Sequence, residues 1–119
     1  MELTKSQKRE VKALIKIGIN RGCQKWLDET VRIIQEPYVE GEENPWDRSL
    51  VITKRSRNYF KDTMRREDNF YRDSWLLFSV ATLINEDNLQ YEEVEPLGEE
   101  ILAAVHLIAD KFCPIKPGV

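Results

Sequence analysis

The sequence predicts an all-α protein, a compact irregular bundle of four to five helices with a central apolar helix near residues 70–84. Gly and Pro, the residues that break helices, number only five each among 119 residues. Leu, Ile, Glu, Lys and Arg are frequent, and the apolar residues recur at helical spacing. Apolar residues make up 41% of the chain, which is enough for one core. We therefore expect a single helical domain over residues 1–119.

The first helix is predicted to begin after Thr4, because Thr4 and Gln7 have the spacing of a capping box. The sequence does not determine where this helix ends. Either Gly22 ends it through a left-handed C-cap, or one helix runs to Gln35 and Gly18 and Gly22 let a neighbour pack closely. With either end, the second half of residues 4–35 carries one apolar face, made of Cys23, Trp26, Leu27, Val31 and Ile34.

An acidic loop is predicted over residues 36–44, and a second helix follows it. Asn44 suits an N-cap, Pro45 suits the first helical position, and Asp47 suits the positive end of the helix dipole. We expect this helix to end near Arg66, because residues 67–69 include Asp and Asn, which prefer caps to helix interiors. Its apolar line is sparse and consists of Trp46, Leu50, Phe60 and Met64.

The segment near 70–84 differs from the others because its apolar residues point in every direction around a helix. Such a helix is normally enclosed by its neighbours. A buried strand is the alternative, but Leu, Ala and Trp outnumber β-branched residues and the length suits a helix better. Residues 85–88 then form a turn, and residues 89–95 allow one helical turn before Pro96.

A last helix is predicted before a short tail at residues 114–119. Its apolar residues recur at steps of three and four, which is the spacing of a stripe that faces a core. They are Leu97, Ile101, Val105, Ile108 and Phe112.

Several features point to a cytoplasmic protein without membrane association. The polar N-terminus argues against a secretory signal. The longest apolar run, Trp75 to Ile84, is far shorter than the roughly 20 residues of a membrane-spanning helix. Cys23 and Cys113 lack the Cys-x-x-Cys spacing and are interpreted as two buried, reduced thiols.

The sequence contains no recognisable catalytic, cofactor-binding or metal-binding pattern. His106 is the only histidine, and the Glu-x-x-His spacing of metal sites in bundles fails because position 103 is Ala. The acidic residues around Asp87 lack the glycine of a calcium loop. We therefore expect no catalytic residue, no cofactor and no metal, although a ligand pocket inside the bundle remains an alternative.

Charge is strongly segregated along the chain. Residues 48–72 carry eight basic and three acidic side chains, whereas residues 73–100 carry eight acidic side chains and no basic one. Four basic residues form a ridge at helical spacing, and a fifth follows them: Lys54, Arg57, Lys61, Arg65 and Arg72. Such a ridge can be a solvated face, a surface for an acidic protein partner, or a phosphate-binding surface for nucleic acid. The net charge of −3 argues against nucleic acid.

The aromatic residues exceed what one small core accommodates, and exposed aromatics mark association sites. The candidates are Trp46, Tyr59, Phe70 and Tyr71. We therefore expect a two-fold symmetric homodimer that buries part of the region from Pro45 to Ile84. The function predicted from the sequence is a non-enzymatic helical protein-interaction module that self-associates. The alternative is a small nucleic-acid-associated factor that uses the basic ridge at 54–72.

Overall fold

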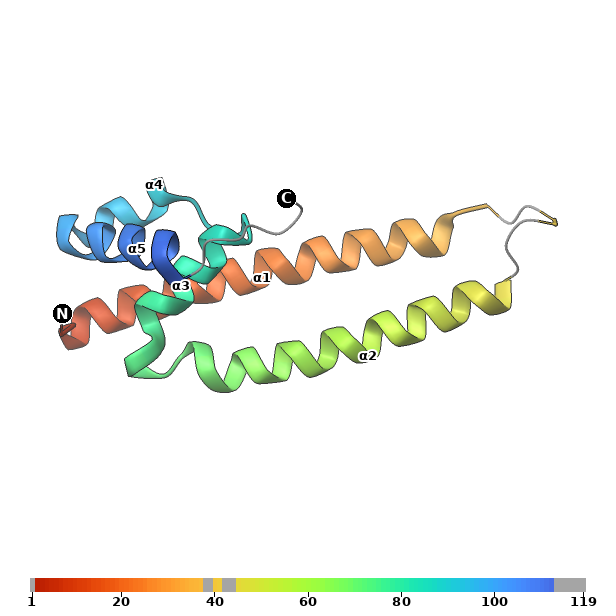
Figure 1. Cartoon of the computed structure of the whole chain (residues 1–119), viewed down its shortest axis with the longest axis horizontal. Helices are drawn as coiled ribbons and strands as arrows, with labels where there is room; N and C mark the ends of the chain where they lie inside the picture. Colours follow the sequence, from red (N-terminus) through yellow and green to blue (C-terminus); the bar gives the residue numbers. More distant parts are fainter. Residues whose placement is uncertain (1, 38–39, 42–44, 113–119) are drawn as a thin grey trace.

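The structure, a computed structural model, describes residues 2–37, 40–41 and 45–112. The described residues form five α-helices, two short 3-10 helices and no strand, which confirms the all-α prediction (Figure 1). The cap at Asn44, most of the acidic loop, Cys113 and the tail at 114–119 lie outside the described residues. The elements in chain order are α1 (Lys5–Gln35), α2 (Pro45–Phe70), η1 (Asp73–Trp75), α3 (Leu76–Asn85), α4 (Tyr91–Val94), η2 (Glu95–Leu97) and α5 (Glu99–Phe112).

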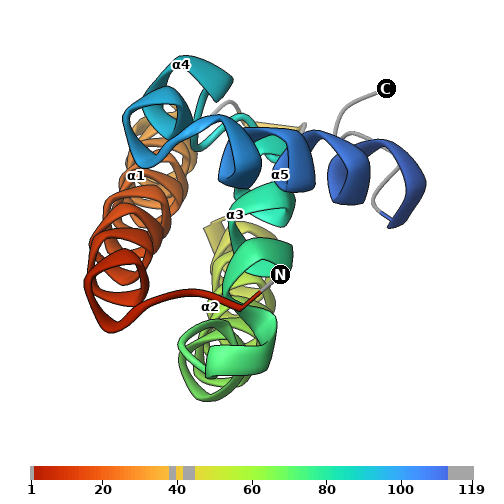
Figure 2. The ribbon, with the colours of Figure 1, turned by 90° about the vertical axis from the view of Figure 1, so that its left-hand side faces the viewer.

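The molecule is elongated, with extents of 59 × 26 × 21 Å, rather than a compact bundle. Helices α1 and α2 form a long antiparallel hairpin, and α3, α4 and α5 pack at one end of it (Figures 1 and 2). The reason is length: at 1.5 Å per residue, α1 and α2 are roughly 46 and 39 Å long, whereas α5 is only about 21 Å. The short helices therefore cover only the half of α1 that follows the N-terminus.

Helix α1 is a single helix, which settles the question left open by the sequence. The capping box is present: the Gln7 amide donates to the Thr4 hydroxyl (3.1 Å), and the Thr4 amide donates to the Gln7 side chain (2.8 Å). Gly18 and Gly22 do not end the helix. A Cβ atom at Gly18 would lie 2.8 Å from a methyl carbon of Leu83, so the glycine allows α3 to approach closely.

Helix α2 begins at Pro45 as predicted but ends at Phe70, so the predicted break at 67–69 is wrong. Tertiary contacts hold the last turn: the Phe70 carbonyl accepts a hydrogen bond from the Ser79 hydroxyl (3.0 Å), and the Arg66 guanidinium lies over the Phe70 ring. These contacts outweigh the weak preference of Asp and Asn for caps. The central apolar helix is consequently α3, which starts only at Leu76.

The core surrounds α3, which packs between α1 and α5. Helix α1 contributes Val11, Leu14 and Ile15 to this core, and α3 contributes an almost continuous set of buried residues. In α5 the predicted stripe is buried at Ile101 and Val105. The buried apolar residues are Val11, Leu14, Ile15, Leu76, Val80, Ala81, Leu83, Ile84, Leu89, Val94, Ile101, Val105 and Ala109.

Helix α4 is tied to α1 by an ion pair in which the Arg21 guanidinium lies 2.6 Å from a Glu93 carboxylate oxygen. The Arg21 hydrogen bond holds the pKa of Glu93 below its ordinary value, although desolvation opposes this shift. The ionised carboxylate therefore stabilises the fold above the ordinary glutamate pKa, and this contribution is lost as the pH falls through the lowered pKa of the folded state.

Glu93→Gln is therefore expected to lower the free energy of unfolding by less than about 1 kcal/mol at pH 7. The difference between variant and wild type should be smaller at pH 3 than at pH 7, because the contribution of the ionised carboxylate declines as the pH falls below the ordinary glutamate pKa. Urea titrations at the two pH values measure this difference. An equal difference at both pH values would contradict an electrostatic role for Glu93.

Candidate protein-interaction face

Beyond the short helices, α1 and α2 have only each other as neighbours in the described chain (Figure 1). Their contact here includes an aromatic stack and side-chain hydrogen bonds. The rings of Trp26 and Tyr59 stack with centroids 4.3 Å apart, and the Tyr59 hydroxyl donates to the Cys23 sulfur (2.6 Å). Burial is the main cause that raises the pKa of Tyr59 above its ordinary value. Tyr59 is thus occupied within the chain and joins the two helices.

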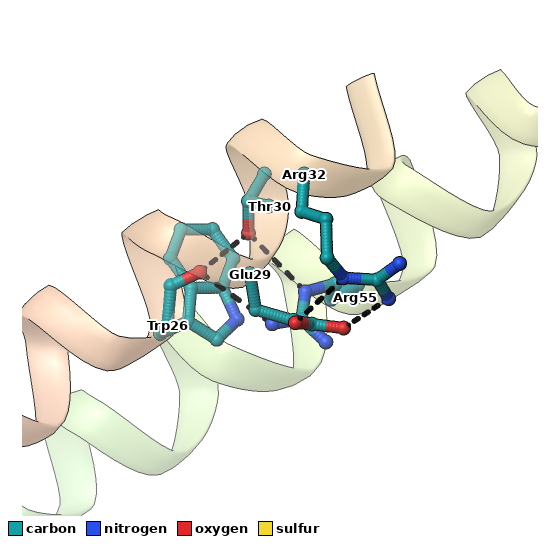
Figure 3. Close-up of polar contacts among 5 residues, drawn as sticks. All are labelled: Trp26, Glu29, Thr30, Arg32 and Arg55. Carbon is teal, nitrogen blue, oxygen red and sulfur yellow. Dashed lines mark hydrogen bonds and ion pairs between the residues drawn. The ribbon is translucent and has the colours of Figure 1, made fainter. Parts of the chain in front are cut away.

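One turn further along, Arg55 joins the same two helices (Figure 3). Its Nε donates to the Thr30 hydroxyl (3.2 Å), and its guanidinium carbon lies 5.5 Å from the centroid of the Trp26 ring. The Thr30 hydroxyl in turn donates to the Trp26 carbonyl (2.8 Å). Beside these contacts, the Arg32 hydrogen bond lowers the pKa of Glu29. These contacts hold the hairpin together without a continuous apolar core between its helices.

The same contacts fix which residues of α1 and α2 are level with one another. Tyr59 is level with Trp26, Arg55 with Thr30, and Arg48 donates to the Glu36 carbonyl near the turn. Counting along both helices from these pairs gives the levels of their exposed residues to within one residue. Ile34 is level with residues 50–51, Val31 with 53–54, Leu27 with 57–58, and Gln24 with 60–61.

Both helices of the hairpin carry exposed apolar side chains at alternating steps of three and four residues. This is the heptad spacing of helices that pack side by side in coiled coils and bundles. Large apolar side chains that are about half exposed or more occupy most of these positions: Ile17, Leu27, Val31 and Ile34 in α1, and Trp46, Leu50, Phe60 and Met64 in α2. Smaller or polar residues fill the remaining steps: Ala13, Asn20 and Gln24 in α1, and Thr53 and Arg57 in α2.

We call these two rows together the open seam. Because successive residues are turned by about 100°, the α1 row lies about a quarter turn from Trp26 and Thr30, which face α2. It lies nearly opposite Leu14 and Gly18, which face the core. The same count turns Phe60 by about 100° from Tyr59, onto this side of the hairpin, and turns Leu50 by about 180°, to the outer edge of α2. Figure 2 shows that the short helices pack on the other side of the hairpin. The open seam therefore extends from the outer side of α1 to the outer edge of α2.

The exposures within the open seam are large. Trp46 is 69% exposed, Phe60 67% and Ile34 55%. Single exposed apolar residues are common on soluble proteins, but a contiguous set on one face indicates an interaction surface. The sequence assigned Leu27 and Val31 to one face with Cys23 and Trp26. The structure separates them, since Trp26 faces α2 and Leu27 faces outward.

The basic ridge predicted from the sequence lies on the outer side of α2, where Lys54, Arg57, Lys61 and Arg65 are all exposed. None of these four side chains forms an ion pair with another described residue. Arg57 also belongs to the open seam. Arg72 lies beyond the end of α2, immediately before η1, and so does not continue the ridge.

Of the four candidate interface aromatics, Trp46 is the one that is widely exposed. Tyr59 stacks on Trp26, Phe70 lies under the Arg66 guanidinium at 5.3 Å, and Phe70 and Tyr71 pack against the core while remaining half-buried. Their use as interface residues stays a prediction. The heptad alternation along both helices is the sequence signal that would have located the open seam.

An open cleft of about 520 Å³ lies between α1, α2 and the end of α3. Its walls include Cys23, Tyr59 and the ion pair between Arg66 and Glu86. In the described part of the chain, no three His, Cys, Asp or Glu side chains gather as metal ligands would. His106 is exposed and stacks on Tyr91 with ring centroids 3.7 Å apart. We assign no chemistry to this cleft.

Comparison with known proteins finds no relative of this chain. Neither protein-family models, nor curated proteins, nor solved structures match this chain. Among the described helices, none is apolar enough over a sufficient length to cross a bilayer.

Proposed function

We propose that the protein is a helical protein-interaction module that self-associates, and that two copies pair through their open seams to form a four-helix bundle. The observation that carries this proposal is the geometry of the seam. One row at heptad spacing lies on the outer side of α1 and one runs along the outer side of α2, and no described residue covers them. In a four-helix bundle each hairpin contributes two such rows to a shared core.

A second copy fits this face because it supplies two helices with rows of matching length. At 1.5 Å per residue, the α1 row spans about 26 Å from Ile17 to Ile34, and the α2 row spans about 27 Å from Trp46 to Met64. A single partner helix would cover one row and leave the other exposed. Homo-oligomers with two-fold symmetry are also the commonest soluble assemblies.

Sedimentation equilibrium over a range of concentrations tests the proposal. The chain has a mass of 14.0 kDa, so a species of about twice this mass should dominate at micromolar concentration and dissociate on dilution. The helical content by circular dichroism should remain constant while the mass changes. A single species of 14.0 kDa at high micromolar concentration would remove the proposal.

Nucleic acid binding remains the alternative, supported by the four exposed cations of the basic ridge. It ranks lower because Arg57 lies in the open seam, Arg72 lies apart from the ridge, and the net charge is −3. A gel shift that weakens steeply with salt, and that is lost when Lys54, Lys61 and Arg65 are replaced by Ala, would support it.

A further inference from the structure

We infer that the two copies pair about a two-fold axis parallel to the helices, so that α1 of each copy lies against α2 of the other. This inference rests on the proposed function and specifies how the second copy is seated. Two hairpins that meet face to face have one other two-fold arrangement, with the axis across the helices. In that arrangement α1 packs on α1, α2 packs on α2, and the two α1–α2 turns lie at opposite ends.

The charges beside the open seam favour the parallel axis. Asp28 is exposed at the outer edge of the α1 row, where it accepts a hydrogen bond from Gln24 (2.8 Å). The outer edge of the α2 row is basic, with Lys54, Arg57 and Lys61. A parallel axis places Asp28 of each copy level with Arg57 of the second copy. Opposite charges then meet along both outer edges of the interface.

The other arrangement would bring two basic edges together. Because α2 would then pack on α2, the side chains of Lys54, Arg57 and Lys61 would face the same cations of the second copy. Like charges in contact across an interface are strongly unfavourable. The basic ridge of α2 thus acquires a role as one edge of the interface, with the partner's α1 supplying the compensating carboxylate.

A charge swap between Asp28 and Arg57 tests this pairing. Each contact occurs twice in a two-fold dimer, so Asp28→Arg and Arg57→Asp should each weaken self-association about tenfold. The double variant should recover to within about threefold of wild type, since Arg at 28 then meets Asp at 57 of the second copy. Tighter self-association of Arg57→Asp alone would overturn the inference, because that result is expected only where the basic edges face each other.

Cross-linking of single-cysteine chains provides a direct geometric test. In a background where Cys23 and Cys113 are replaced by Ser, a Val31→Cys chain is mixed with a size-tagged Thr53→Cys chain. A parallel axis places these positions at the same level on facing helices, so oxidation should yield the mixed disulfide. The matched control mixes Val31→Cys with a tagged Asn20→Cys chain and should yield little product.

The two experiments separate failure of the inference from failure of the proposed function. A dimeric mass with the Val31–Asn20 product in place of the Val31–Thr53 product would overturn the parallel axis but would still support self-association. A monomeric mass for the unmodified chain would overturn both the parallel axis and the proposed self-association. A dimeric mass with the Val31–Thr53 product and rescue by the double charge swap supports both.

Discussion

Leu50→Glu is expected to make the protein monomeric, whereas Val51→Glu should leave the dimer intact. The two side chains are adjacent in α2 and equally exposed, at 51% and 50%. They differ in direction: Leu50 belongs to the open seam and is level with Ile34, whereas Val51 is turned by about 100° towards the opposite face. Because the dimer is symmetric, the Leu50→Glu substitution removes two leucines from the interface and places two carboxylates there, which lose their hydration when the dimer forms. We expect self-association to weaken at least 100-fold, or about 2.7 kcal/mol.

Sedimentation equilibrium of both variants, with circular dichroism as a check on folding, measures this effect. Neither substitution should alter the fold of a single chain, because both positions are already half exposed in it. Dissociation of both variants would mean that the interface is not confined to the open seam. Persistence of the Leu50→Glu dimer would show that the open seam is not the interface.

The elements that the sequence predicted well are those set by local chemistry. The capping box of Thr4 and Gln7 acts within one turn, and Pro45 favours the first position of a helix whatever the chain does elsewhere. The stripe of α5 was readable because its spacing is regular and its buried members, Ile101 and Val105, face one neighbour. Such signals need no knowledge of distant contacts.

The end of α2 was not predictable in this way. Asp68 and Asn69 favour a break, but contacts made by Phe70 and Arg66 with segments more than eight residues away extend the helix by one turn. The same limit applies to Gly22, which suits a C-cap locally. It remains helical because the Asn88 side chain packs where a side chain at position 22 would lie.

The proposed interaction face was expected from the sequence only in part. The sequence placed it within Pro45 to Ile84 because the aromatic residues exceeded the needs of one core. Two of those aromatics, Tyr59 and Phe70, make contacts within the chain instead. Composition cannot show that a hairpin protrudes beyond the short helices, and so it could not distinguish Leu27, which faces outward, from Trp26, which faces α2.

Leu83→Ala is expected to have the largest effect on the stability of the fold, with a loss of about 2–5 kcal/mol in the free energy of unfolding. Leu83 is fully buried in α3, and one of its methyl carbons packs against α1 at Gly18, which has no side chain. Because Gly18 has no side chain, nothing at that position can move into the space that Leu83 would vacate. The cavity should therefore persist, which favours the upper part of the range.

Urea unfolding at a fixed chain concentration measures this loss, because self-association adds to the apparent stability. Leu107→Ala is the matched control: Leu107 is 53% exposed in α5, and its substitution should change the free energy of unfolding by less than about 0.5 kcal/mol. A loss below about 1 kcal/mol for Leu83→Ala would contradict the tight packing of α3 on α1.

The two substitutions should also act independently, because Leu83 and the open seam lie on opposite sides of α1. Folded Leu83→Ala protein should self-associate with wild-type affinity, since its seam residues keep their positions. Leu50→Glu should lower the apparent stability only to the extent that dimerisation contributed to it, and the difference should vanish on dilution. A change in self-association on Leu83→Ala would instead mean that the core and the seam are coupled through α1.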